Sequence, residues 1–331
     1  MVESFIAVDC MPNVDKDFMK QTQNSTPLIL TAGSTYLDID AYACIVAMTE
    51  LLRLKGENAV AYSSAPCNYS VCRSLAKEGQ IERELPCDLD TSDAKYIILD
   101  VSDPVFLKDS IPLDRVIGIY DHHVGFEDFW KDRIGDVAHI EFIGAAATLV
   151  FREWKLCGIH EKMTRATALL LIAAILDNTL DLTSSNTTDE DVEAFKELCR
   201  MADVGDYFRA AYFSEVQSSV EADLENALFG DIKTVRDNAV LPPRMAQLSV
   251  WNAGSILARL PEIRTWFEDN TDGWLINVID IKDRCSYFVC EDSRYQEKIE
   301  DVFGVRFDSG VARSDAPYLR KQIIKKTISK N

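Results

Sequence analysis

The chain has 331 residues, of which 47% are hydrophobic and 27% charged, as in a globular protein of about two domains rather than a disordered or fibrous chain. Its formal net charge of -19 argues against nucleic acid or an anionic membrane as a partner, unless bound cations or a local basic patch offset it. Nine scattered cysteines without a CxxC pair, and an acidic first segment unlike a signal peptide, favour a cytoplasmic protein. The longest apolar run, Ala166–Leu176, is too short to span a membrane.

Short apolar runs alternate with helical patterns in the first half of the chain. This alternation predicts a parallel sheet with helices on both faces. Asp100 and Asp121 directly follow two of the predicted strands, at the sheet edge where such folds bind ligands. Strands are predicted at residues 27–31, 59–62, 96–99 and 115–120, and helices at 41–54, 145–156, 164–176 and 188–201.

The second half of the chain has a different texture. Residues 202–229 are polar and compatible with helix, without a strong apolar stripe, and predict a boundary region. Beyond them, strand patterns at 245–251, 274–281 and 285–290, with a helix at 256–267, predict a smaller α/β domain. We therefore expect a catalytic domain over residues 1–205, a linker over 206–229 and a second domain over 230–331.

Acidic and imidazole side chains concentrate at the predicted strand and helix ends. They are Asp38, Asp40, Asp100, the triplet Asp121–His123 and Asp177. Carboxylates suit Mg²⁺ or Mn²⁺, and an imidazole shifts the preference toward Mn²⁺ or Co²⁺. A pair of such ions ~3.5–4 Å apart is the usual arrangement for hydrolysing phosphoesters and phosphoanhydrides. The triplet is the most informative motif, because the chain has only four histidines and two of them are adjacent.

These motifs resemble the DHH phosphoesterases, and within them the branch of manganese-dependent (family II) inorganic pyrophosphatases and cytosolic exopolyphosphatases. The similarity continues into a second domain of the DHHA2 type, so it extends over roughly residues 27–328. The matching segments are Gly33–Asp40, Leu99–Asp100, Gly118–His123, Gly144–Leu149, Ile175–Asp191, Asp231–Lys233, Trp274–Ile281 and Leu319–Ile324.

The resemblance implies an α/β catalytic domain joined to a smaller α/β domain, with the substrate in the cleft between them. It further implies metal-dependent hydrolysis of phosphoanhydride bonds in pyrophosphate or short-chain polyphosphate. Two divalent ions, Mg²⁺ or Mn²⁺, are expected as cofactors. Asp38 and Asp100 are expected to bind the first ion, and Asp40, Asp100, His122 and Asp177 the second.

The remaining expected roles concern the phosphates. By the same resemblance, His123 contacts the bound phosphate or assists the leaving group, while Asp121 orients the imidazoles. Lys233, Arg320 and Lys321 are expected to clamp the phosphates. Residues 313–331 hold six basic and one acidic side chain, which makes such a clamp plausible in an acidic protein.

The sequence departs from the pyrophosphatase pattern at three places. Ser34 stands where those enzymes place a metal-binding histidine and exopolyphosphatases usually an asparagine. Val101–Asp103 differs from the usual pyrophosphatase segment, which favours an exopolyphosphatase-like or divergent member. Leu319 replaces the serine of the closing motif, so one hydrogen bond to phosphate is expected to be missing. The alternatives are a regulatory or binding protein with weakened catalysis, and a nucleotide phosphodiesterase. The expected partner is a small phosphate substrate, with neither nucleic acid nor membrane, and a homodimer is possible.

Overall fold

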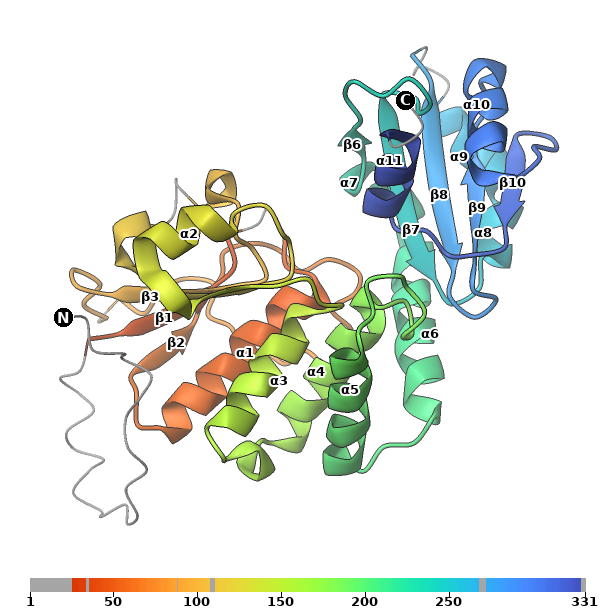
Figure 1. The fold of residues 1–331 in the computed structure, drawn as a ribbon. Coiled ribbons are helices and arrows are strands. Elements are labelled where there is room, and N and C mark those ends of the chain that lie inside the picture. The colour runs from red at the N-terminus through yellow and green to blue at the C-terminus, as the bar shows by residue number, and fades with distance from the viewer. Residues whose placement is uncertain (1–25, 34–35, 88, 108–110, 268–271, 329–331) are drawn as a thin grey trace.

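The computed structural model describes residues 26–33, 36–87, 89–107, 111–267 and 272–328 (Figure 1). The acidic first segment and Ser34, on which two expectations depend, lie outside these residues. The chain forms two lobes, each built on one five-stranded sheet. The predicted architecture, a parallel-sheet α/β unit followed by a smaller α/β unit, is confirmed.

The N-terminal lobe contains a fully parallel sheet in the order β2-β1-β3-β4-β5. Its central strands are buried on both faces, which explains why they appear in the sequence as continuous apolar runs. The edge strand β5 was not predicted, because it has only three residues and a polar one among them. The strands are β1 (Leu28–Thr31), β2 (Ala59–Ala61), β3 (Lys95–Leu99), β4 (Val116–Asp121) and β5 (Ala138–Ile140).

Helices cover both faces of this sheet. The helix α2 (Glu127–Ile134) contacts β4 and β5, and the other helices form a layer on the opposite side (Figure 1). This layer consists of α1 (Ile39–Leu54), α3 (Ala146–Leu156), α4 (Arg165–Asn178) and α5 (Asp189–Ala202). Short 3₁₀ turns cover Pro104–Phe106, Leu113–Arg115, Gly135–Val137 and His160–Lys162.

Two helices, α6 (Tyr207–Ala222) and α7 (Leu224–Gly230), join the lobes. The sequence predicts no strong apolar stripe in this region, and the structure shows which of its side chains are buried. Buried side chains recur every four residues along it, but serine, glutamine and glutamate between them hide the period in the sequence. The buried stripe is Tyr212, Val216, Val220, Leu224 and Leu228.

The C-terminal lobe contains a mixed sheet in the order β10-β9-β8-β7-β6. β7 and β8 are parallel, and the other neighbouring strands are antiparallel. Only the three longest strands were predicted from their apolar runs. The strands are β6 (Lys233–Thr234), β7 (Arg244–Val250), β8 (Trp274–Asp280), β9 (Cys285–Val289) and β10 (Val311–Ser314).

The helices of this lobe depart from the prediction at one place. The single helix expected over 256–267 is divided into α8 (Gly254–Ala258) and α9 (Leu260–Phe267). Pro261 explains the break, because it has no N–H to donate to the carbonyl four residues earlier. Two further helices, α10 (Ser293–Phe303) and α11 (Arg320–Ile328), were not predicted, since charged residues dominate both.

One continuous hydrophobic core extends from Ile29 in β1 to Val289 in β9, and so includes side chains of both lobes. A smaller cluster, which includes Met245 and Phe288, lies within the C-terminal lobe. None of the described helices combines the length and apolar character needed to cross a bilayer.

Candidate metal centre

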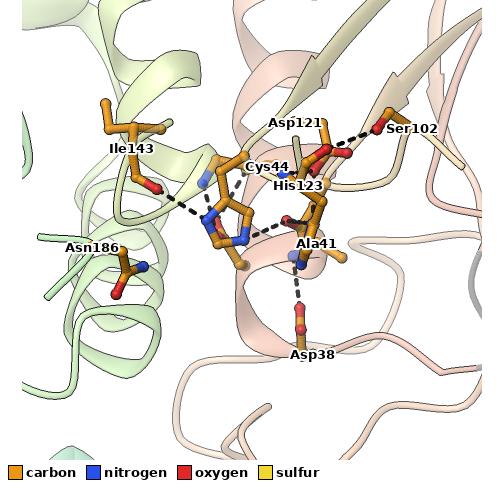
Figure 2. Close-up of polar contacts among 12 residues, drawn as sticks. Asp38, Ala41, Cys44, Ser102, Asp121, His123, Ile143 and Asn186 are labelled. Atoms are coloured by element: carbon orange, nitrogen blue, oxygen red, sulfur yellow. Dashed lines mark hydrogen bonds and ion pairs between the residues drawn. The ribbon is translucent and has the colours of Figure 1, made fainter. Parts of the chain in front are cut away.

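The expected ligands gather at the carboxyl edge of the first sheet, beside the point where the strand order reverses. β2 lies on one side of β1 and β3 on the other, so the reversal falls between β1 and β3. Asp100 directly follows β3, and Asp121 is the last residue of β4. Open α/β sheets bind ligands in this crevice. Figure 2 shows the polar contacts around Asp38, Asp121 and His123.

Asp100 presents an unpaired carboxylate oxygen to an unpaired imidazole nitrogen. Its Oδ1 lies 3.5 Å from His122 Nε2 and 3.9 Å from His123 Nδ1. Asp100 and His122 are both buried, and within the described part of the chain neither Asp100 Oδ1 nor His122 Nε2 has a hydrogen-bond partner. Leaving buried polar atoms unpaired is costly, and a cation bound between these two would satisfy both.

The other ring nitrogen of His122 fixes its tautomer. Nδ1 lies 3.3 Å from the carbonyl oxygen of Ile143, which can only accept, so Nδ1 carries the hydrogen and Nε2 keeps its lone pair. Burial lowers the pKa of His122 to about 3, and the charges of His123 and Lys321 add to the effect. The imidazole is therefore neutral near pH 7, the form that binds metals.

His123 takes up a proton more readily than His122. Its Nδ1 donates to Asp121 Oδ1 at 2.8 Å, and 57% of its side chain is exposed. Desolvation opposes protonation, but the hydrogen bond and charge of Asp121 outweigh it and raise the pKa of His123. The pKa of Asp121 is lowered, because its hydrogen bond and charge interaction with His123 outweigh the effect of burial, which acts to raise it. The two residues form an ion pair in which the imidazole is cationic over a wider pH range than usual.

Asp40 lies against the N-terminus of α3. Its Oδ2 accepts a hydrogen bond from the Ala146 amide at 2.9 Å, and its Oδ1 accepts one from the Ala147 amide at 2.8 Å. A helix N-terminus favours negative charge, so this contact stabilises the carboxylate. Burial and the charge of Asp38 nevertheless raise the pKa of Asp40 to about 8.

Asp38 and Asp177 each accept a hydrogen bond that holds the carboxylate in place. Asp38 caps α1, where its Oδ1 accepts from the Ala41 amide at 3.0 Å (Figure 2). Asp177, near the end of α4, accepts from the hydroxyl of Tyr212 at 2.9 Å. Burial raises the pKa of Asp177 to about 7, and the charge of Asp38 acts in the same direction.

The carboxylates of the centre destabilise one another. Burial raises the pKa of Asp100 well above its usual range, and repulsion from Asp40, Asp38 and Asp121 adds to it. Concentrated negative charge of this kind is relieved by a bound divalent cation, which lowers all of these pKa values together.

The structure brings the expected ligands together to different degrees. Asp100, His122 and His123 form the tightest group in the described residues, with ligand atoms that all lie within 4.8 Å of one another. The other three candidates lie outside this group. They are Asp38, Asp40 and Asp177, each held by the amide or hydroxyl contacts given above.

Lys321, at the start of α11 in the C-terminal lobe, interacts electrostatically with residues of the centre. Desolvation lowers the pKa of Lys321, while the nearby carboxylates, Asp100 foremost, act to raise it. The next residue, Gln322, donates from Nε2 to the hydroxyl of Ser185 in the N-terminal lobe at 2.6 Å. The beginning of α11 therefore lies beside the acidic centre.

Arg320 and Lys233 make different contacts. The Arg320 guanidinium forms an ion pair with the Asp231 carboxylate and donates to the Asp231 carbonyl oxygen at 2.7 Å. The Lys233 ammonium lies 5.8 Å from the centre of the Tyr36 ring, which belongs to the N-terminal lobe. A phosphate would have to compete with Asp231 for the guanidinium.

Sequence reasoning missed the residues that hold the centre in place. Asp191 is fully buried and accepts from the Gly144 amide at 2.9 Å and the Thr148 hydroxyl at 2.6 Å. These contacts fix the start of α3, whose amides bind Asp40. The sequence placed Gly144 and Asp191 in two of the matching segments, and the acidic first turn after Thr188 predicts a capped helix, but neither signal predicts the contact between the two residues.

Comparison with known proteins shows which proteins the chain is similar to. No protein-family model matches the chain. A Deinococcus radiodurans protein named as a manganese-dependent inorganic pyrophosphatase is 22% identical over 320 residues, which cover 92% of this chain and 98% of that protein. A Staphylococcus haemolyticus protein of the same name is 24% identical, over 86% and 92% of the two chains. The chain is similar to manganese-dependent pyrophosphatases along nearly its whole length.

Solved structures agree on the fold. A Methanococcus jannaschii protein assigned to the family II inorganic pyrophosphatases superposes with a TM-score of 0.61 at 16% identity, over 91% of this chain and 99% of that one. An exopolyphosphatase-related protein from Bacteroides fragilis gives a TM-score of 0.50 at 12% identity, over 95% and 94%. At these identities the likeness establishes the two-lobed fold, and the chemistry has to be argued from the residues.

Proposed function

We propose that this protein is a divalent-metal-dependent hydrolase of phosphoanhydride bonds, acting on pyrophosphate or short-chain polyphosphate. The observation that carries the proposal is a pair of buried atoms, Asp100 Oδ1 and His122 Nε2, which lie 3.5 Å apart and have no hydrogen-bond partner among the described residues. The manganese-dependent pyrophosphatases among its relatives give the substrate class.

The donor set suits hard divalent cations. In the proposal, Asp100 and His122 form the centre, and the nearby carboxylates complete one or two ion sites with Mn²⁺ or Mg²⁺. When bound, such ions supply Lewis acidity and lower the pKa of a water molecule. The proposed ligands are Asp38, Asp40, Asp100, His122 and Asp177.

The side chains around the ligands have separate tasks in the proposal. His123 is exposed and its pair with Asp121 raises its pKa, so in the proposal it donates a proton to a phosphate oxygen or to the leaving phosphate. Asp121 holds the His123 ring by its Nδ1 hydrogen. Lys321 offsets the charge of a bound phosphate, with Arg320 and Lys233 further along the C-terminal lobe.

The proposal is tested by phosphate release from pyrophosphate, tripolyphosphate and long-chain polyphosphate. Protein freed of metal with EDTA should be inactive, and Mn²⁺ or Mg²⁺ should restore release from one of the shorter substrates. Asp100→Asn should reduce the rate at least about 100-fold, since the carboxylate loses its charge at the centre. Asp103→Asn is a matched control, because it is the same substitution three residues away. Asp103 caps a 3₁₀ turn and is not a proposed ligand.

A protein that releases no phosphate under any of these conditions would contradict the proposal. Equal activity of Asp100→Asn and Asp103→Asn would contradict the placement of the metal centre instead. Both variants lose one carboxylate, but only Asp100→Asn loses the one that lies near His122.

A further inference from the structure

We propose that Tyr212 is a positioning residue, which orients Asp177 for metal binding and connects it to the C-terminal lobe through α6. The inference rests on the proposed function, because it takes Asp177 as a metal ligand. Tyr212 itself would touch neither the metal nor the substrate.

The hydroxyl of Tyr212 has two acceptors within reach. It lies 2.9 Å from Asp177 Oδ1 and 3.1 Å from the carbonyl oxygen of Ser70, and the Tyr212 side chain is 3% exposed. A hydroxyl has one hydrogen, and an ionised carboxylate is a stronger acceptor than a carbonyl. The hydrogen bond to Asp177 therefore fixes the rotation of that carboxylate, as outer hydrogen bonds do at metal sites.

The same hydroxyl also reaches the segment that carries the first motif. The hydroxyl of Ser70 accepts a hydrogen bond at 2.9 Å from the amide of Ile39, which lies between Asp38 and Asp40. Ser70 therefore connects Tyr212 to the backbone between Asp38 and Asp40, although Tyr212 comes from the helix that joins the lobes.

The neighbouring residues of α6 contact the C-terminal lobe. The ring of Phe213 stacks on Trp251 at the end of β7, with centres 5.6 Å apart and planes 6° from parallel. One turn later, Gln217 accepts from the Asn252 amide at 2.9 Å and donates to the Asn252 carbonyl oxygen at 3.2 Å. Because consecutive side chains of one helix hold Asp177 and the C-terminal lobe, a rotation of that lobe would reorient the carboxylate.

The direct test is the affinity of the full chain for Mn²⁺, measured by titration calorimetry and by electron paramagnetic resonance of the free ion. Tyr212→Phe removes only the hydroxyl and should weaken Mn²⁺ binding about tenfold. Tyr69→Phe is the matched control, since it removes a tyrosine hydroxyl that lies 3.3 Å from Asp223, which is not a proposed ligand. The control should leave the affinity unchanged.

A double-mutant cycle with Asp177→Asn separates positioning from general loosening of the structure. Asp177→Asn alone should weaken Mn²⁺ binding, and Tyr212→Phe should then have no additional effect. If Asp177→Asn leaves the affinity unchanged, the ligand set of the proposed function is wrong. If Asp177→Asn weakens binding and Tyr212→Phe does not, the proposed function stands and the role of Tyr212 is refuted.

A second variant covers the case in which Tyr212→Phe does not fold. Trp251→Leu removes the stack on Phe213 without changing any residue at the centre. It should weaken Mn²⁺ binding on the order of threefold, through the displaced α6. An unchanged affinity for Mn²⁺ in this variant would refute the link between Asp177 and the C-terminal lobe.

Discussion

The metal-free protein should become less stable as the pH rises from about 6.5 to about 8. Burial raises the pKa of Asp40 to about 8 and that of Asp177 to about 7, whereas an aspartate in the unfolded chain titrates near 4. The folded protein therefore holds more protons than the unfolded chain in this range. It must give them up as the pH passes the folded pKa values, so the free energy of unfolding falls.

The size of the fall follows from the two pKa values. One pKa unit corresponds to about 1.4 kcal/mol, so Asp40 contributes a loss of about 1.5 kcal/mol and Asp177 about 0.8 kcal/mol over this range. His122 works in the opposite direction. Its pKa of about 3 means that only the unfolded chain still holds its proton near pH 6.5. That difference returns about 0.4 kcal/mol, so these three groups together give a loss of about 2 kcal/mol. The raised pKa values of Asp100 and His123 act in the same direction as those of Asp40 and Asp177.

Urea unfolding of EDTA-treated protein at the two pH values measures this difference directly. Asp40→Asn should remove most of it, because the amide does not titrate. Saturating Mn²⁺ should remove it as well, since the bound cation takes the place of the protons. A metal-free protein that is equally stable at both pH values, or more stable at the higher one, would refute the reasoning.

Three other substitutions have defined outcomes. Asp191→Asn should lower the free energy of unfolding by about 3 kcal/mol, because a buried carboxylate with several donors loses part of its network; a loss too small to detect by urea unfolding would contradict its placement. His123→Gln should slow phosphate release about 100-fold, with the Mn²⁺ affinity little changed, if it donates a proton. Arg320→Lys should raise KM for the phosphate substrate about tenfold, since lysine cannot bind two oxygens in one plane; an unchanged KM would show that Arg320 stays with Asp231.

The sequence was sufficient for the parts of the molecule governed by local patterns. β1, β3 and β4 are apolar because both sheet faces are covered, and such runs are legible without a structure. Asp100 and Asp121 could be placed at one edge because parallel strands end on the same side. The pairing of Asp100 with His122 follows from that placement and from the two neighbouring strands.

Contacts between distant segments could not be predicted in this way. Nothing near Asp40 in the sequence indicates that the amides of α3 will bind it, since the partners are more than a hundred residues apart. Tyr212 gave no signal either, because its helix resembles a polar connector until the fold shows which face is buried. The motif predicted that Lys233, Arg320 and Lys321 clamp the phosphates, which stays a prediction, and the ion pair of Arg320 with Asp231 could not be predicted because it depends on the geometry of the second sheet.

The core shared by the two lobes also limits how a lobe of this protein can be exchanged for that of a relative. Because α6 buries one stripe of side chains against both lobes, a boundary at which the lobes could be separated does not lie in that helix. A chimera that takes its C-terminal lobe from a relative would have to bring along a partner for Phe213, in place of Trp251. Without one, the exchanged halves would each expose an apolar surface, and we would expect the hybrid to aggregate before its chemistry could be compared.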